Sequence, residues 1–408
     1  MKNKKSNEGH IKGITQLIAD AVIHTTNLVE DAHRQIVHPP LLPSTFVQKL
    51  ITKIAGISYN GVRWGTHAVS KQIEKGLEHF DIESDIAHST PQHRAVHAAL
   101  NGVIGDYLKA SNNPLQIQLH FRHKGDVVSI DKAAIAQSYP SINGKILLLI
   151  HGSCMNDLLW TREGHDHGIA LAEALGFTPI YVCYNSGLHI SNNGRMLTRA
   201  IQELIGHWPV PVEELTILAH SMGGLVTRSA VYYADVEQLT WSSYLKKIFF
   251  LGTPHHGAPL EQAGSYIDHI LTTIPYTRPF ARLAKIRSAG VTDLRYGNIT
   301  DADWKDYDRF QLYGDQRVVV PLPSTVSCYS IAAITAATAT STAAQLVGDG
   351  LVGVDSALGK HTDQDRDLQF DVERTWLAYE HNHLDLLSSG KVYEQLKRWI
   401  VESEANEQ

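Results

Sequence analysis

The sequence has few of the features that mark several large classes of protein. Of its 408 residues only 3 are cysteines, Cys154, Cys183 and Cys328, and no two of them form a Cys-x-x-Cys pair. This excludes a disulfide framework, a zinc ribbon and a dithiol redox site, and it favours a reducing compartment. Basic residues (36) are fewer than acidic ones (42), so the net charge of −6 gives no electrostatic footprint for nucleic acid.

Long hydrophobic runs are also missing. Lysines are frequent in residues 1–7, but an amphipathic pattern follows them instead of the apolar run of a secretory signal peptide. The uncharged stretch 318–348 is rich in Ala, Thr and Ser and contains Pro321 and Pro323, so we interpret it as a buried strand and a small-residue loop rather than a membrane span. We therefore expect a cytoplasmic protein, with peripheral membrane contact as a further option.

The rest of the composition is that of an ordinary globular protein. Apolar residues make up 43% of the chain, which is enough for a sizeable core and excludes disordered, collagen-like and coiled-coil classes. A chain of 408 residues corresponds to about two to three average domains, or to fewer if an α/β domain is large.

Residues 1–114 are predicted to be an N-terminal helical extension. Apolar residues over 14–29 recur at spacings typical of one helical face, and a weaker pattern predicts a helix over 66–80. Thr90 and Pro91 are suited to cap and begin a third helix.

From residue 115 to 408 the pattern changes to short apolar strands that alternate with helices. This alternation indicates a mostly parallel sheet covered by helices on both faces, so the fold class is α/β. An aromatic-rich interval at about 258–314 interrupts the alternation, and we interpret it as an inserted helical cap. The predicted elements are a hairpin of 115–119 and 127–130 around a turn at 123–126, strands at 145–150, 179–183, 215–219, 248–251 and 326–333, and helices at 164–175, 193–206, 223–234 and 392–401.

The strongest local signal is the segment Leu215-Thr-Ile-Leu-Ala-His-Ser-Met-Gly-Gly-Leu225. An apolar strand runs into a tight turn with Ser221 at its apex, and a helix follows, which is the arrangement of a nucleophile elbow. Ala219 and Gly223 are the small neighbours that such a strained turn requires. We interpret Ser221 as a catalytic nucleophile, with an ordinary strand-to-helix turn as the alternative.

A serine nucleophile needs a histidine base and an acid that orients it, and after an elbow they follow in the order acid, then histidine. His383 lies in a loop before the last predicted helix and is our candidate base, with His381 and His361 as rivals. Asp349 lies between two glycines after the strand at 326–333 and is our candidate acid. Its rivals are Asp355 and Asp315. The alternative without a catalytic role is that this Gly-Asp-Gly segment is only a surface turn.

Two N–H groups are needed to stabilise a tetrahedral oxyanion. The residue after the nucleophile, Met222, is expected to supply one of them. The other is expected from Ser153, because it follows His151-Gly152 at the end of the Leu-rich strand, and Cys154 is its neighbouring rival.

Five segments in this order resemble those of α/β-hydrolase lipases and esterases, in particular bacterial lipases and GPI inositol-deacylase-like serine esterases. The segments are Leu149-Ile-His-Gly-Ser153, Ala219-His-Ser-Met-Gly-Gly224, Leu251-Gly-Thr-Pro-His-His-Gly257, Asp349-Gly-Leu-Val352 and Asn382-His-Leu-Asp385. The resemblance covers about residues 115–408 and implies an α/β-hydrolase fold, the triad Ser221, Asp349 and His383, and an oxyanion hole from Ser153 and Met222. Some related lipases bind calcium near the position of Asp385, but Ser389 replaces a later ligand, so neither calcium nor another cofactor is predicted.

The 23 histidines suggest a second hypothesis, that the protein is a metallohydrolase. Close pairs occur at His165/His167, at His255/His256 and at His381/His383, but none has the helical spacing of a zinc site and no cysteine accompanies them. We therefore interpret His255 and His256 as structural or pocket-lining, and His165 and His167 as solvated or hydrogen-bonded.

The function predicted from these residues is hydrolysis of a carboxylic ester, with an apolar acyl ester or a lipid as substrate. The alternatives are an acyltransferase that uses the same triad, and a non-catalytic binding or scaffold protein with a hydrolase fold. The amphipathic face at 14–29 has few basic residues, so docking on the hydrolase core is favoured over docking on a membrane. The sequence does not fix the oligomeric state.

Overall fold

The computed structural model describes most of the chain after residue 90. The described residues are 91–139, 141–258, 270–273, 287–309, 311, 314–338 and 347–406, together with the helical positions Gly13, Gln16, Leu17, Asp20 and Ile23. The rest of the predicted helix at 14–29, the helix at 66–80 and most of the aromatic part of the predicted cap lie outside these residues.

The chain divides into two units. The boundary predicted at residue 114 falls inside the first of them. One unit comprises Met1–Ser89 and Leu108–Gln116, and the other comprises Thr90–Tyr107 and Ile117–Gln408. In the first unit, the Gln16 side chain donates a hydrogen bond to the Ser111 carbonyl (3.1 Å).

Most of helix α3 (Pro91–Ala110) belongs to the second unit because two of its glycines allow close packing. A Cβ atom on Gly102 would lie 2.3 Å from the Cys154 sulfur, and one on Gly105 would lie 1.9 Å from the Asn185 side chain. The Asn185 amide donates to the Gly105 carbonyl (3.0 Å). The helix is therefore packed against the turns that follow two strands of the sheet.

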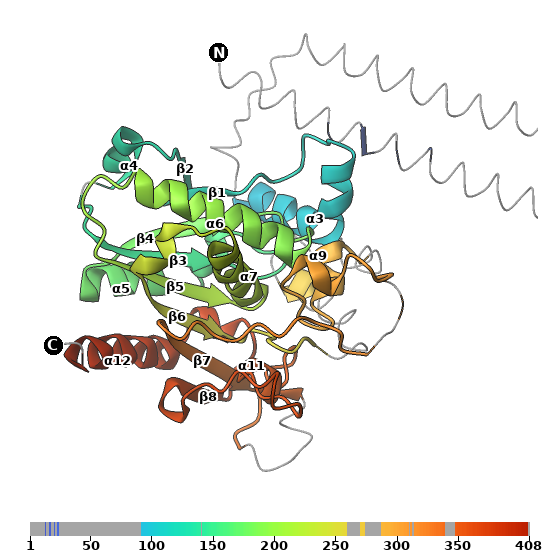
Figure 1. Ribbon diagram of the computed structural model, residues 1–408. Coiled ribbons are helices and arrows are strands. Elements are labelled where there is room, and N and C mark those ends of the chain that lie inside the picture. The colour runs from blue at the N-terminus through green and yellow to red at the C-terminus, as the bar shows by residue number, and fades with distance from the viewer. Residues whose placement is uncertain are drawn as a thin grey trace, which may run out of the picture. The chain divides into compact units, whose positions relative to one another are not determined.

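The centre of the second unit is an eight-stranded sheet with the order β2-β1-β4-β3-β5-β6-β7-β8 (Figure 1). The strands from β3 onward are parallel to one another, whereas β1 pairs antiparallel with both β2 and β4. The bounds are β1 His120–His123, β2 Asp126–Val128, β3 Lys145–Ile150, β4 Thr178–Cys183, β5 Glu214–His220, β6 Leu245–Leu251, β7 Ser327–Ile334 and β8 Thr375–Tyr379.

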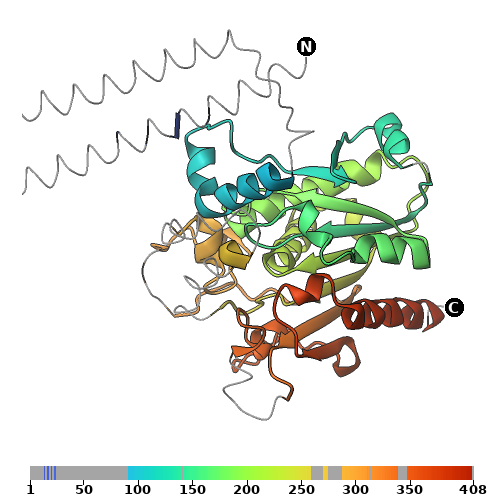
Figure 2. The same cartoon turned by 180° about the vertical axis from the view of Figure 1, so that it is seen from behind.

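Helices cover both faces of this sheet, as predicted (Figures 1 and 2). Helices α5 and α12 lie side by side, since the Tyr393 hydroxyl of α12 donates to the Ala170 carbonyl of α5 (3.4 Å). Helices α6 and α7 pack together on the other face. The helix bounds are α4 Lys132–Ser138, α5 His167–Leu175, α6 Ile190–Gly206, α7 Met222–Val236, α9 Ala289–Asp293, α11 Val354–Ala357 and α12 Gly390–Asn406.

The central strands are buried along nearly their whole length. Every residue of β5 is buried, and so is every residue of β3 after Lys145. A strand covered on both faces needs apolar side chains in both directions, so it is a continuous hydrophobic run instead of an alternating one. This explains why these strands could be predicted from sequence.

The first strand of the predicted hairpin was placed too early, whereas the second overlaps the observed strand. Its strands are β1 and β2, and the turn contains only Lys124 and Gly125. Both residues have positive φ, at 49° and 89°, which is the conformation of a two-residue type I′ turn. Residues 115–119 are not a strand.

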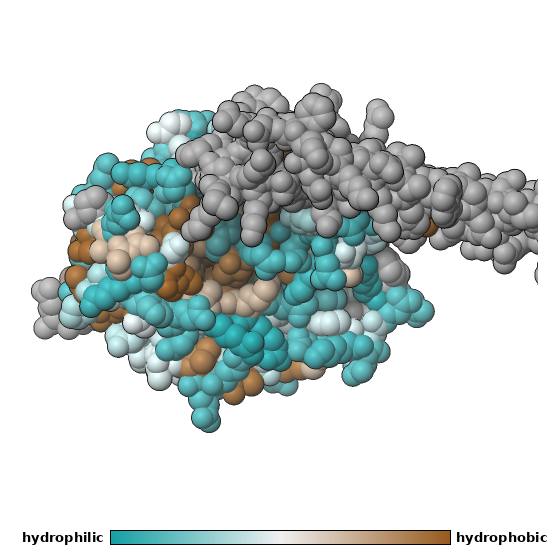
Figure 3. Space-filling view, turned by 90° about the horizontal axis from the view of Figure 1, so that it is seen from above, coloured by the Kyte–Doolittle hydropathy of each residue, from teal (hydrophilic) through white to brown (hydrophobic). Residues whose placement is uncertain are grey.

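Exposed hydrophobic side chains are mostly scattered. Hydrophilic residues dominate the described part of the face in Figure 3, and hydrophobic residues form smaller patches between them. Among the described helices, none is both long and apolar enough to cross a membrane.

Candidate active site

Ser221 lies at the point where β5 ends and α7 begins. Its backbone has φ 56° and ψ −127°, a strained conformation for a residue with a side chain. The Ser221 N–H donates to the Leu251 carbonyl of the neighbouring strand β6 (2.8 Å), and the side chain makes no capping bond to α7. This is the geometry of a nucleophile elbow.

Small residues around the elbow are required by the backbone itself. A Cβ atom on Gly223 would lie 2.4 Å from the Ile150 carbonyl oxygen and 2.6 Å from that of His151. A Cβ atom on Gly152 would lie 3.0 Å from the Cβ of Ser221. The end of β3, the start of α7 and the serine therefore meet with no room for larger residues.

Asp349 is held in a tight turn by glycines on both sides. Gly348 and Gly350 have φ values of 53° and 94°, which favour glycine. The Oδ1 atom of Asp349 accepts the N–H groups of Leu351 (2.9 Å) and Val352 (2.8 Å). Its other oxygen, Oδ2, accepts the Nδ1–H of His383 at 2.6 Å.

His383 follows β8 and is buried with Asp349. The exposed fractions of the two side chains are 1% and 0%. The His383 backbone N–H also donates to the Asp349 carbonyl (3.2 Å). Since the charge-assisted bond occupies Nδ1 as a donor, the other ring nitrogen, Nε2, is the one available as a base.

The structure places the rival residues elsewhere. His381 bonds to the Ser389 hydroxyl (2.7 Å). Asp315 forms an ion pair with Arg317 (2.7 Å) and lies 3.9 Å from His361. Asp355 is exposed in the first turn of α11. The structure thus pairs Asp349 with His383 and with none of the alternative histidines.

Leu251 and Gly252 connect the Asp349–His383 pair to the elbow. Leu251 accepts the Ser221 N–H, and a Cβ atom on Gly252 would lie 3.1 Å from both Cε1 and Nδ1 of His383. Consecutive residues at the end of β6 therefore touch the serine on one side and the histidine ring on the other.

His220 is a site residue that the sequence analysis did not identify. Its Nε2–H donates to the His383 carbonyl (3.0 Å), and the two rings lie 4.7 Å apart. Its Nδ1 is buried and has no hydrogen-bond partner among the described residues. Burial and the neighbouring His383 hold the pKa of His220 well below its usual range. The only sequence signal is its position directly before Ser221, so we regard it as a positioning residue.

The predicted oxyanion donors lie on the same edge of the sheet. Met222 is the first residue of α7, where helix N–H groups have no intrahelical acceptor. Ser153 is fully buried. The N–H of its rival Cys154 already donates to the Ser186 hydroxyl (2.9 Å), which leaves Ser153 as the better candidate of the two. Burial raises the pKa of the Cys154 thiol to about 12.

The other histidine pairs have bonding partners or apolar surroundings. His165 bonds to His167 (2.8 Å), and His167 in turn donates to the Leu386 carbonyl (2.9 Å). His256 bonds to the Gly359 carbonyl (2.9 Å), and His255 packs against Phe250. In the described part of the chain no three His, Cys, Asp or Glu side chains are grouped as a metal site requires.

The buried histidines predict a loss of stability in mild acid. Burial lowers the pKa of His151 and His167 to about 4, and it holds the pKa values of His220 and His255 well below their usual range. The unfolded chain binds protons at these groups below pH ~6.5, whereas the folded chain does not bind them until about pH 4. Stability is therefore full above pH 6.5 and falls as the pH decreases, by up to about 1.4 kcal/mol per pH unit for each histidine.

Urea unfolding followed by circular dichroism at pH 7.5, 6 and 5 measures this effect. We expect the unfolding midpoint to decrease at each step. A midpoint that stays constant between pH 7.5 and 5 would contradict the prediction. Exchange of the exposed His207 for Gln is the control, and it should leave the pH dependence unchanged.

The sheet order and the elbow together define an α/β-hydrolase fold. Within the chain, residues 182–335 match the family described as the PGAP1-like alpha/beta domain. The matched region contains Ser221 and ends before Asp349 and His383. No curated protein matches the chain.

Several solved structures are similar to this one at low sequence identity. A lipase of Bacillus licheniformis in mature form is 14% identical, with a TM-score of 0.42, over 63% of this chain and 91% of its own. Lipase B of Aspergillus fumigatus is 10% identical, with a TM-score of 0.39, over 69% and 55%. An esterase of Pyrobaculum calidifontis is 11% identical, with a TM-score of 0.39, over 83% and 96%.

Proposed function

We propose that the protein is a serine carboxylic-ester hydrolase that forms an acyl-enzyme on Ser221. The observation that carries the proposal is the buried hydrogen bond between Asp349 and His383 (2.6 Å) beside the strained elbow serine. An acid that orients a histidine next to a serine in this conformation is the arrangement that activates a hydroxyl group.

The proposed reaction has two halves. In the first, His383 takes the Ser221 proton while Oγ attacks the ester carbonyl carbon, and the negative oxygen is stabilised by the N–H groups of Ser153 and Met222. His383 then gives the proton to the leaving alcohol as the ester C–O bond breaks. In the second half, water replaces the alcohol and His383 is again the base, so the acid is released and Ser221 is restored.

The carboxylate of Asp349 keeps the imidazole in the productive tautomer. Its Oδ1 is held by two backbone N–H groups, so Oδ2 has a fixed position toward Nδ1 of His383. It also stabilises the imidazolium that forms when the serine proton is transferred. The bond from His220 to the His383 carbonyl fixes the backbone on the other side of the ring.

We further propose an ester with an apolar acyl group, or a lipid, as the substrate. The aromatic-rich composition of residues 258–314 supports this choice. Described parts of this interval also carry buried hydrophobic residues, including Ile270, Leu271, Val291 and Leu294.

The experiment is hydrolysis of p-nitrophenyl esters from acetyl to palmitoyl, with and without a chelator, combined with labelling by a fluorophosphonate. We expect ester hydrolysis that survives chelation, and a covalent label on the peptide that contains Ser221. Labelling together with turnover only when an alcohol or thiol is present would favour the acyltransferase. A folded protein that is inert to all esters and to the label would contradict a catalytic role.

A further inference from the structure

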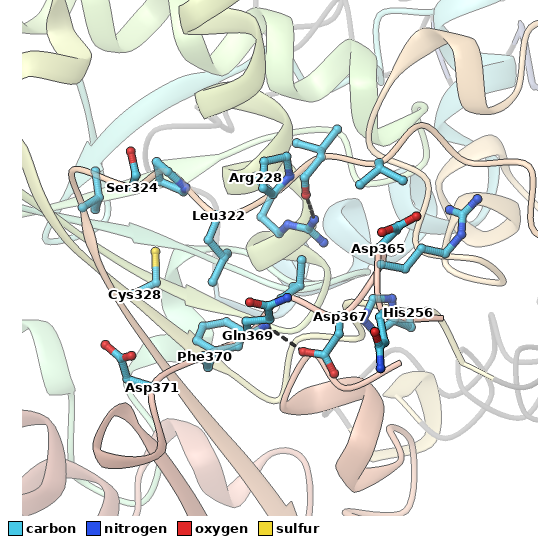
Figure 4. A pocket seen from close by; sticks show the side chains of 18 of the residues that line it. Arg228, His256, Leu322, Ser324, Cys328, Asp365, Asp367, Gln369, Phe370 and Asp371 are labelled. Carbon is cyan, nitrogen blue, oxygen red and sulfur yellow. Dashed lines mark hydrogen bonds between the residues drawn. The ribbon is translucent and has the colours of Figure 1, made fainter. Parts of the chain in front are cut away.

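A cavity of about 500 Å³ opens beside α7, away from the elbow. The described residues that line it include none of Ser153, Ser221, Met222, Asp349 and His383. Its volume lies within the range of about 300–1,000 Å³ that is usual for ligand pockets. Its walls come from α7, from the segment 317–326 before β7, and from the segment 364–374 before β8 (Figure 4).

Arg228 of α7 is the central charge of this cavity. It follows Ser221 by seven residues, which is about 10 Å along the helix. The residue is 7% exposed. One guanidinium nitrogen, Nη2, donates to the Val320 carbonyl (2.7 Å), whereas the buried Nε has no hydrogen-bond partner among the described residues (Figure 4).

No described carboxylate pairs with Arg228, although the other arginines of the cavity all have acidic partners. Arg317 and Arg366 share Asp315, at 2.7 and 3.4 Å, and Arg374 lies 3.3 Å from Asp371. Burial and the nearby Arg317 lower the pKa of Arg228 to about 9. A buried cation without an anion is unfavourable, and an anionic ligand would relieve this.

The described acidic residues near Arg228 form no ion pair with it. The charge of Asp303 acts on Arg228, but its oxygens accept the backbone N–H groups of Thr300 and Val318. Asp365 and Asp367 line the cavity. Asp365 is exposed to solvent. Asp367 accepts the backbone N–H groups of Gln369 (2.8 Å) and His361 (3.3 Å), so its oxygens hold the turn of its own segment. Among the arginines of the cavity, Arg228 is therefore the one that has no ion-pair partner in the described part of the chain, which suits a monoanion.

Most of the cavity lining is polar, but part of it is apolar. The apolar part of the lining includes Val318, Val319, Leu322 and Phe370. Val318 and Val319 are 41% and 49% exposed, so part of their hydrocarbon surface is uncovered. A planar guanidinium matches the geometry of a carboxylate, since it can donate two parallel hydrogen bonds.

We propose that this cavity binds an amphipathic monocarboxylate, with the carboxylate on Arg228 and the hydrocarbon chain against Val318, Val319 and Leu322. The site is distinct from the catalytic elbow and does not depend on the proposed hydrolase activity. It gives the protein a place for a medium-chain or longer fatty carboxylate.

Calorimetric titration with octanoate tests the proposal, with 1-octanol, acetate and inorganic phosphate as comparison ligands. We expect octanoate to bind the wild type, and both octanol and acetate to bind more weakly, because each lacks one half of the ligand. Arg228→Gln should lower octanoate affinity roughly 10- to 100-fold, which is the usual effect of losing a charge-assisted hydrogen bond.

Arg374→Gln is the matched control, because Arg374 lines the same cavity but already has an acidic partner. It should leave octanoate binding within about twofold of the wild type. Arg228→Lys, which keeps the charge without the planar fork, should bind octanoate with intermediate affinity and serves if Arg228→Gln does not fold.

Three results would overturn the proposal. They are no octanoate binding to the wild type, equal binding to the wild type and Arg228→Gln, and equal binding of octanol and octanoate. Binding of phosphate as tight as that of octanoate would indicate a general oxyanion site instead of a carboxylate site. This result would also overturn the proposal.

Discussion

Replacement of Ser221 by Ala is expected to lower kcat/KM for the preferred p-nitrophenyl ester by about 10⁴-fold or more, because the attacking oxygen is lost and only binding and oxyanion stabilisation remain. The fold should be retained, since the Ser221 side chain makes no capping bond to α7. Initial-rate kinetics and circular dichroism measure the two effects. Ser243→Ala is the matched control, because Ser243 is exposed and should keep full activity.

A second variant at the same position separates chemistry from strain. Ser221→Gly should be as inactive as Ser221→Ala, but it should unfold at a higher temperature, because glycine adopts a φ of 56° without a clashing Cβ. Activity of either variant close to that of the wild type would refute the assignment of the nucleophile.

Asp349→Asn is expected to lower kcat by roughly 10³- to 10⁴-fold, although it removes no atom from the side chain framework. The two backbone N–H groups at Oδ1 will select the amide oxygen for that position, so the NH₂ group must face His383. The histidine then has to accept at Nδ1 and carry its proton on Nε2, where it can no longer accept the serine proton.

The rate of ester hydrolysis and the pH–rate profile measure this change. Asp355→Asn is the control, because Asp355 is exposed at the start of α11 and should keep the wild-type rate. If Asp355→Asn were the inactive variant and Asp349→Asn were fully active, the assignment of the acid would be wrong.

The central part of the fold could be predicted because its signals are local. Buried parallel strands such as β3 and β5 are continuous apolar runs, and each is followed by a helix with its own apolar face. Strand β8 was missed because it lies at the edge of the sheet and only Ala378 in it is buried. A half-exposed strand that contains Thr, Trp and Tyr has no such run.

The parts of the site that lie within one continuous sequence motif could be predicted, and the contacts between distant segments could not. Ser221 lies in one strand–turn–helix segment, whereas the hydrogen bond between Asp349 and His383 joins residues 34 positions apart. The bond from His220 to the His383 carbonyl spans 163 positions. Arg228 looks in the sequence like any other helix arginine, because its lack of an ion-pair partner among the described residues depends on how three distant segments pack.

The packing of α3 has a consequence for the order in which the protein can fold. Gly102 and Gly105 leave the ribosome before every strand of the sheet, yet Gly105 bonds to a side chain 80 positions later, and the Gly102 carbonyl accepts from Ser288, 186 positions later. These contacts are non-local, and such contacts form late because long loops must close first. Helix α3 can therefore pack in its final position only after most of the sheet has been synthesised. The turn that carries Ser153 and Cys154 reaches its final packing only when helix α3 binds against it.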